Sequence, residues 1–380
     1  MNPSNRLSTN KTISAKVQSF AEYCRQSWRG IAIGAAFVFF LSVGSLLYAL
    51  FAPKASSVLQ DAIGIDHTDE IIGDYRLLDG VSVSSTEEIA LLPLAVMVEN
   101  SYEAWPLSGV ADANIVFEAP VEGSITRFML VFDPTTTSTK IGPVRSARPY
   151  YVDLAEALGG LYGHVGGSPE ALAQIKASDR IWNVDEFYYG VTGFWRSEDR
   201  YAPHNTYTSI ELLNGIVEKK EFTPMGFTPW IFSDESPEFA RVYTEDISVP
   251  YLGAYRAHWS YNQETRLYTR YQNGIAQRDS NSSIVKANTV VLLLTDSEVI
   301  DDYGRLHIRT TGSDKALLFR DGTVQEGYWR REEGGYLRFE TIEGQDLFFA
   351  RGKAWVSIMT SEDAFDEILV APDSDVLIED

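Results

Sequence analysis

The sequence predicts one N-terminal transmembrane helix, then an α/β ectodomain and a β-rich C-terminal domain. Three observations lead to this fold class. Residues 31–52 carry no charge, strand-like and helix-like patterns alternate between about 91 and 230, and short strands rich in Tyr, Trp, Thr and Val follow. The expected parts are a tail (1–29), a transmembrane helix (30–52), a stalk (53–90), an α/β domain (91–230), a β-rich domain (231–370) and an acidic tail (371–380).

The uncharged run from Ile31 to Ala52 is long enough to cross a bilayer, because about 20 helical residues span roughly 30 Å of hydrocarbon. Signal-peptide cores are shorter, at about 7–15 residues, although whether this segment is ever cleaved stays open. Five basic residues and one acidic residue precede the run. We therefore expect a single-pass cell-membrane protein with a cytoplasmic N-terminus and an extracytoplasmic bulk.

Cysteine usage and charge exclude several classes of partner and site. Cys24 is the only cysteine and precedes the apolar run, so the outer part has neither disulfides nor cysteine-ligated metal. The formal net charge is −21, which argues against nucleic acid as a partner. The stalk is rich in Ser, Asp and Glu, as extended linkers are.

The α/β pattern begins at Leu91. We expect buried strands at 94–98, 114–118, 126–132, 140–144 and 161–165. Pro149 fits the first position of a helix that continues to Leu158 and stops at Gly159. Ser168 is a good N-cap for a second helix that Pro169 opens and that runs to about Ala177.

The second half reads as a β-rich domain. Residues 289–294 (TVVLLL) predict a buried strand, and Asn273-Gly274 and Asp321-Gly322 predict two-residue hairpin turns. A short late helix is expected near residues 361–365, before the acidic tail.

Arg127, Arg145, Ser146 and Arg148 are the first candidate ligand-binding residues. Arg145 and Arg148 come just before the predicted helix that begins at Pro149, and backbone N–H groups at such a helix start favour an anion. Arg148 precedes a proline and should be extended. The guanidinium fork suits phosphate or carboxylate. The alternative is that these arginines form ion pairs with Glu118, Glu122 or Asp153.

Two further segments contribute candidates to the same site. His164, Gly166, Gly167 and Ser168 form a strand–turn–helix whose N–H groups could face an anion, or a plain capped turn. His204 and Asn205 lie in a polar loop, either as ligand contacts or as turn formers.

Cofactor chemistry has weaker support in the sequence. Asp112, Glu118, Glu122 and Asp133 flank the predicted strand ends, where oxygen ligands would suit Mg²⁺, but salt bridges explain them as well. No His pair has zinc-ligand spacing, so we expect no cofactor. The aromatic residues Trp182, Phe187, Tyr188, Tyr189, Phe194 and Trp195 predict a packed core or interface, or else a groove for sugar or lipid.

Several motifs resemble the YerB-like family of bacterial membrane-attached extracytoplasmic proteins of unknown function. They are Met97 to Asn100, Leu107 to Gly109, Ala111-Asp112, Glu122 to Arg127, Ile141 to Arg148, Gly166 to Pro169, Pro203 to Asn205, Leu318 to Arg320, Gly327 to Arg330 and Gly352 to Trp355. The resemblance covers roughly residues 90–360 and implies no established activity. Typical members carry a lipid-attached cysteine, whereas this chain has the predicted helix.

A second, weaker similarity is to the LytR-CpsA-Psr envelope phosphotransferases, in residues 141–153 and 164–171. It implies a lipid-linked pyrophosphate ligand. The leading hypothesis is a membrane-anchored envelope protein that binds an anionic, phosphate-bearing or glycan-linked ligand. The alternatives are a glycopolymer phosphotransferase and a non-enzymatic assembly protein that binds other envelope proteins.

Overall fold

The computed structural model of the protein describes residues 75–243 and 246–369. The predicted tail (1–29), transmembrane helix (30–52) and acidic tail (371–380) lie outside these residues. Within the described ranges, no helix combines the length and apolar character needed to cross a bilayer. Part of the predicted stalk is described, and there the expectation of an open linker is wrong. Leu78 and Asp79 are buried, and Asp79 accepts hydrogen bonds from Arg76 and Asn114.

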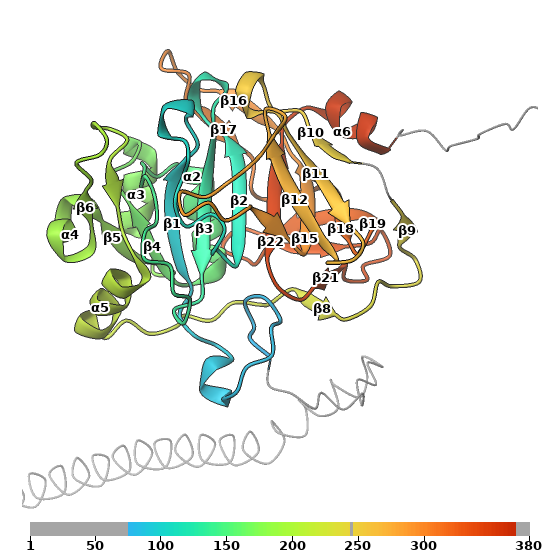
Figure 1. Ribbon diagram of the computed structural model, residues 1–380, viewed down its shortest axis with the longest axis horizontal. Coiled ribbons are helices and arrows are strands. Elements are labelled where there is room, and N and C mark those ends of the chain that lie inside the picture. The colour runs from blue at the N-terminus through green and yellow to red at the C-terminus, as the bar shows by residue number, and fades with distance from the viewer. Residues whose placement is uncertain (1–74, 244–245, 370–380) are drawn as a thin grey trace, which may run out of the picture. The chain divides into compact units, whose positions relative to one another are not determined.

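The central feature is an eleven-stranded sheet with the order β20-β19-β18-β15-β22-β2-β3-β1-β4-β5, in which β9 also pairs with β19 (Figure 1). Its strands are β1 (Leu94–Glu99), β2 (Ile115–Pro120), β3 (Thr126–Phe132), β4 (Leu161–His164), β5 (Trp182–Asp185), β9 (Arg241–Val242), β15 (Thr289–Leu294), β18 (Gly312–Arg320), β19 (Thr323–Arg331), β20 (Arg338–Glu340) and β22 (Ala354–Met359). Strands from both predicted domains therefore belong to one sheet.

Six strands of this sheet form two groups of parallel neighbours that point in the same direction. β15, β22 and β2 pair in parallel, and so do β1, β4 and β5. β3 lies between the two groups and is antiparallel to both β2 and β1. The carboxyl ends of all six strands therefore lie along one edge of the sheet, which is where α/β sheets commonly bind ligands.

Apolar side chains cover both faces of the sheet. One face packs against α2 (Pro149–Leu158) and α3 (Pro169–Ala177). The other face packs against α5 (Ile210–Lys220), α6 (Glu362–Leu369) and a five-stranded sheet. This second sheet consists of β10 (Ile247–Val249), β11 (Ala257–Asn262), β12 (Leu267–Gln272), β13 (Ile275–Ala276) and β14 (Lys286–Ala287). The first half thus has the predicted α/β character and the second half the predicted β-rich character, and both halves form the layers of one fold.

Local signals placed several of these elements correctly. Pro149 opens α2 and Gly159 ends it in the left-handed conformation, with φ +61°. The side chain of Ser168 accepts the N–H of Ala171 at the start of α3. Both residues of the Asn273-Gly274 and Asp321-Gly322 turns have positive φ, as two-residue hairpins require.

The prediction of a strand at residues 140–144 is wrong. This segment makes only isolated bridges, from Ile141 to Thr208, from Gly142 to Ser108 and from Val144 to Val98. Its N–H and C=O groups bond in turn to three separate segments, because it crosses the end of β1 instead of extending the sheet.

Three shorter strand pairings and a further α-helix lie outside these two sheets in the part of the chain that the structure describes. The pairs are β6 (Trp195–Arg196) with β7 (Thr206–Tyr207), β8 (Ile231–Ser233) with β21 (Phe348–Ala350), and β16 (Ser297–Val299) with β17 (Leu306–Ile308). The helix is α4 (Glu186–Gly193), which is kinked at Gly190.

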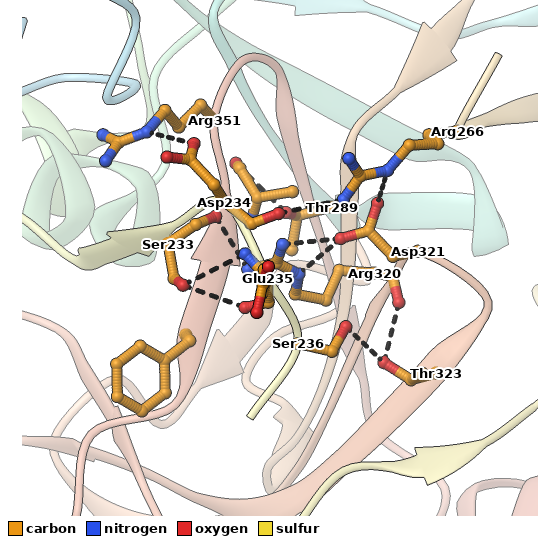
Figure 2. A network of polar contacts seen from close by, with 12 residues as sticks. Ser233, Asp234, Glu235, Ser236, Arg266, Thr289, Arg320, Asp321, Thr323 and Arg351 are labelled. Atoms are coloured by element: carbon orange, nitrogen blue, oxygen red, sulfur yellow. Dashed lines mark hydrogen bonds and ion pairs between the residues drawn. The ribbon is translucent and has the colours of Figure 1, made fainter. Parts of the chain in front are cut away.

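Buried and half-buried arginines fix the segment that joins the two halves (Figure 2). Arg320 is fully buried, donates to Asp321 and to the carbonyl oxygen of Ser233, and thereby holds β8. Arg351 pairs with Asp234 at 2.8 Å and also donates to the carbonyl oxygen of Gly80. The motif that contains Arg320 therefore has a structural role, tying residues 231–236 to the β-rich half.

Candidate functional site

The candidate site forms where residues 141–148 cross the carboxyl end of β1. The N–H of Arg145 donates to the carbonyl oxygen of Met97 at 2.9 Å, and the N–H of Glu99 donates to that of Pro143 at 3.1 Å. The N–H of Val144 donates to Thr206 in β7. These backbone bonds bring β1, the arginine segment and the His204 loop together.

A buried carboxylate lies at the centre of this meeting point. Glu99 is 3% exposed, and its Oε2 accepts hydrogen bonds from Ser101 Oγ at 3.0 Å and from His204 Nδ1 at 2.8 Å. Arg145 Nε lies 3.5 Å from the same oxygen. The second oxygen, Oε1, is buried without a hydrogen-bond partner among the described residues. Glu99 therefore orients His204 and Arg145 and still has an acceptor free.

His204 is held by one ring nitrogen only. Nδ1 faces Glu99, the side chain is about one quarter exposed, and no hydrogen bond to Nε2 exists within the described residues. Ser101 Oγ lies 3.5 Å from the same Nδ1. A serine-protease-type triad places serine and carboxylate on opposite ring nitrogens, so this is not such a triad.

Arg127 contributes a buried cation close to the same segment. Its residue exposure is 6%, and its Nη1 donates to the carbonyl oxygen of Ser146 at 2.7 Å. Its Nε has no partner, and no carboxylate of the described chain forms an ion pair with it. Burial lowers the pKa of Arg127, and the neighbouring charge of Arg148 lowers it further. The predicted position of Arg127 near Arg145 and Ser146 is present in the structure.

Arg148 forms an ion pair, which is the alternative to ligand binding that the sequence left open for these arginines. It is extended, with φ −132°, as its position before proline predicted. Its Nε and Nη2 bond to the two carboxylate oxygens of Glu122 at 2.6 and 2.8 Å. Burial, the largest single effect, opposes ionisation of Glu122, but the hydrogen bonds and charge of Arg148, together with the charge of Arg127, lower the pKa of that carboxyl overall. The ion-pair alternative thus holds for Arg148.

The turn after β4 favours the alternative of a plain capped turn for His164, Gly166, Gly167 and Ser168, because most of its polar groups bond within the protein. His164 is fully buried, with Nδ1 2.8 Å from the carbonyl oxygen of Gly166 and Nε2 2.8 Å from Asn183. The N–H of Gly166 donates to Asp185. Ser168 caps α3, and Gly167 bridges to Ala147. These groups therefore hold the Arg145 segment against β4, and they do not point toward a ligand.

Asn205 holds the turn between β6 and β7. Its Oδ1 accepts from Arg196 Nη1 at 3.1 Å, and its backbone bonds to Ser197. It does not join the Glu99 cluster, although it shapes the loop that presents His204.

The four predicted metal-ligating acids lie apart, each with its own partner. Asp112 accepts from Ser138, Glu118 pairs with Arg270, Glu122 with Arg148, and Asp133 with Arg76. Over residues 75–243 and 246–369, no group of three or more metal-ligating side chains converges.

The aromatic run divides between core and surface. Phe194 is buried, and Trp182 stacks on Phe222 with ring centroids 4.4 Å apart. On α4, however, Phe187 and Tyr188 are 73% and 83% exposed, together with Val191. The expectation of a core holds for only part of the run.

Sequence reasoning missed Glu99 and Ser101 as site residues. The available signal was a glutamate ending a wholly apolar strand, LAVMVE, where burial of a charge requires partners. Those partners, Arg145 and His204, come from segments that only the fold brings together.

Comparison with known proteins identifies relatives over most of the chain. Residues 78–223 match the family described as "Protein of unknown function (DUF3048) N-terminal domain", and residues 247–356 match the corresponding C-terminal domain. The relative named "Putative lipoprotein YerB", from Bacillus subtilis (strain 168), is 33% identical over 282 residues, covering 72% of this chain and 82% of the relative.

A solved structure agrees with this relationship. The crystal structure of the YerB protein from Bacillus subtilis matches with a TM-score of 0.66 at 29% identity, covering 76% of this chain and 98% of that chain. The similarity to LytR-CpsA-Psr phosphotransferases is not shown by these findings and stays an expectation. With the motifs, the sequence identity and the structural match in agreement, the chain belongs to the YerB-like family of DUF3048 proteins.

Proposed function

We propose that this chain is a membrane-attached extracytoplasmic protein of the bacterial envelope that binds an anionic ligand, phosphate-bearing or glycan-linked, beside Arg127 and Arg145. The observation that carries the proposal is Arg127, a guanidinium that is 6% exposed and forms no ion pair with a carboxylate among the described residues, although the charge of Glu122 acts on it. A buried charge without an ion-pair partner costs several kcal/mol. A bound anion would offset much of that cost.

The surrounding groups define what the ligand should offer. Arg145 lies over Glu99 at 3.5 Å and is about one quarter exposed, so it can reach a ligand without losing its own contact. Arg148 is already neutralised by Glu122 and shapes the site. Glu99 Oε1 and His204 favour a ligand that carries hydroxyl groups next to its anionic group.

Calorimetric titration of the full chain with pyrophosphate tests the binding. We expect saturable binding that Arg127→Met and Arg145→Met each weaken at least tenfold, which corresponds to about 1.4 kcal/mol. Arg241→Met is the matched control, because Arg241 is an exposed arginine paired with Glu326. Absence of binding, or equal weakening by the control, contradicts the proposal.

The membrane attachment is proposed from the uncharged segment 30–52 and from the relative's name as a lipoprotein. Cys24 is the only cysteine, so the native chain contains its own topology probe. A membrane-impermeant maleimide should label Cys24 only after cells are permeabilised. A Cys24→Ser, Val191→Cys chain should be labelled in intact cells, because Val191 is 92% exposed. Labelling of Cys24 in intact cells would exclude a cytoplasmic N-terminus.

A phosphotransferase is the second candidate, favoured by the Glu99–His204 contact. A carboxylate on Nδ1 leaves Nε2 as a proton acceptor, which is an arrangement used in general-base catalysis, and Arg145 Nε lies 3.5 Å from the same carboxylate. The test is transfer of the glycan-phosphoryl group from a lipid pyrophosphate-linked glycan to an acceptor hydroxyl by the full chain, which breaks the pyrophosphate bond, forms a phosphodiester and releases the lipid monophosphate. His204→Gln should abolish turnover while pyrophosphate still binds, whereas the binding-only function predicts no turnover in either protein. A non-enzymatic assembly role stays a prediction, supported by the exposed α4 residues.

A further inference from the structure

A cavity of about 500 Å³ lies at the same edge of the main sheet as the arginine site, but at the other group of strands. Pro120 and Met359, the last residues of β2 and β22, line it. The β16–β17 hairpin that follows β15 lines it through Val299 and Leu306. The cavity therefore opens above the carboxyl ends of the parallel trio β2, β22 and β15, a usual position for a ligand.

The wall of this cavity is uncharged, although the chain carries a net charge of −21. None of its lining residues is Asp, Glu, Lys, Arg or His. The hydroxyl of Tyr251 bonds to the carbonyl oxygen of Ile358 at 3.1 Å, and that of Ser361 accepts the N–H of Ala364. Two of its polar groups are thus already engaged within the protein, which favours an apolar ligand.

Exposure changes from the floor of the cavity to its mouth. Val121, Val249 and Met359 are at most 3% exposed, whereas Leu252 and Val299 at the mouth are 66% and 65% exposed. Buried apolar side chains beneath an exposed apolar rim suit a flexible hydrocarbon chain. Beyond Val299, Ile300 and Tyr303 extend the exposed apolar surface around the opening.

We propose that this cavity binds the hydrocarbon chain of a lipid. A chain that enters the cavity removes apolar area from water on both partners. A lipid surface over the mouth would cover the exposed rim at the same time, as it does for apolar residues of interfacial proteins.

The cavity and the arginine site both contact the hairpin between β2 and β3, but each would bind its own ligand independently of the other. Gly123 and Ser124, in the connection between β2 and β3, line the cavity, and Glu122 beside them pairs with Arg148. No arginine lines the cavity, so its ligand requires no anionic group.

Photolabelling of the full chain with a diazirine-bearing hexadecanol tests the proposal, with mass spectrometry to locate the labelled residues. We expect labels on the peptides that contain Val121, Val249 and Met359, and loss of these labels with excess unlabelled hexadecanol. Ala364→Trp, which places an indole in the cavity, should reduce floor labelling at least tenfold. Ile275→Trp is the matched control, because Ile275 is 72% exposed and does not line the cavity.

Thr360→Trp is the second blocking variant, since Thr360 lines the cavity at an exposed position and tolerates a larger side chain even if Ala364→Trp unfolds. Floor labelling that is absent, that resists hexadecanol competition, or that persists in a folded blocking variant overturns the proposal. Pyrophosphate titration of the same variants should be unchanged, so failure here is distinguishable from failure of the anion site.

Discussion

The buried ion pair between Glu118 and Arg270 is the most sharply testable contact in the fold. Arg270 on β12 donates through Nη2 to both carboxylate oxygens of Glu118 on β2, each at 2.9 Å, and both side chains are fully buried. Thr126 and Trp355 also donate to Glu118, at 2.9 and 3.1 Å. The pair therefore joins the five-stranded sheet to the main sheet.

Arg270→Met should lower the free energy of unfolding by about 3–5 kcal/mol, because it leaves the Glu118 carboxylate buried without its counter-ion. This is a large part of the roughly 5–15 kcal/mol that stabilises a typical protein. Adding Glu118→Gln removes the charge and leaves a smaller loss, about 1–3 kcal/mol, from imperfectly satisfied hydrogen bonds. The double variant should therefore be more stable than Arg270→Met alone.

Urea unfolding followed by tryptophan fluorescence measures these differences, and Trp355 reports on the site because the Arg270 guanidinium lies 4.7 Å from its ring centroid. Arg241→Met, which removes an exposed arginine, is the control and should change stability by less than about 0.5 kcal/mol. A loss below about 1 kcal/mol for Arg270→Met, or a double variant less stable than the single one, would refute the reasoning.

Three other outcomes follow from the structure. Burial lowers the pKa of Lys353 to about 7 from an ordinary 10.5, although nearby carboxylates oppose the shift. Between these values the unfolded chain binds the proton that the folded chain has released, so unfolding free energy should rise with pH, by at most about 1.4 kcal/mol per unit from this group. In urea unfolding measured at pH 7–9, Lys353→Met should remove this rise of the unfolding free energy with pH. An unchanged rise would mean that another group causes it. Gly160→Ala should destabilise by more than about 2 kcal/mol in thermal unfolding, because its Cβ would lie 2.2 Å from the carbonyl oxygen of Pro93. Gly215→Ala, in the interior of α5 with open space around the new Cβ, should instead stabilise by about 0.5–1 kcal/mol, and a loss there would contradict the helix-propensity argument.

Prediction from sequence succeeded where one segment contains its own signal. The strands at β3 and β15, the Pro-opened helices α2 and α3, and the two hairpin turns at Asn273 and Asp321 depend on neighbours within a few residues. It failed for residues 140–144, whose backbone groups form isolated bridges to three different segments of the chain. Periodicity alone does not distinguish such a crossing from a strand.

The candidate site shows the same division between local and distant signals. Arg127 and Arg145 were identified because arginine is conspicuous in an acidic chain. Arg148 and His164 carried equal local signals, yet Glu122 neutralises the first and Gly166 with Asn183 satisfy the second. Which of these side chains keeps a free group depends on partners that lie from 2 to 26 residues away along the chain.

By itself the sequence determined the family, the uncharged N-terminal segment, the local elements and the presence of arginines beside a helix start, because each depends on residue type and short spacing. Only the tertiary structure decided that both halves contribute to one sheet, that Glu99 meets His204 and Arg145, and that an uncharged cavity opens above β2, β22 and β15. These features depend on contacts between segments far apart in the sequence. Such contacts are selected by the packing of both sheet faces together, which no single segment encodes.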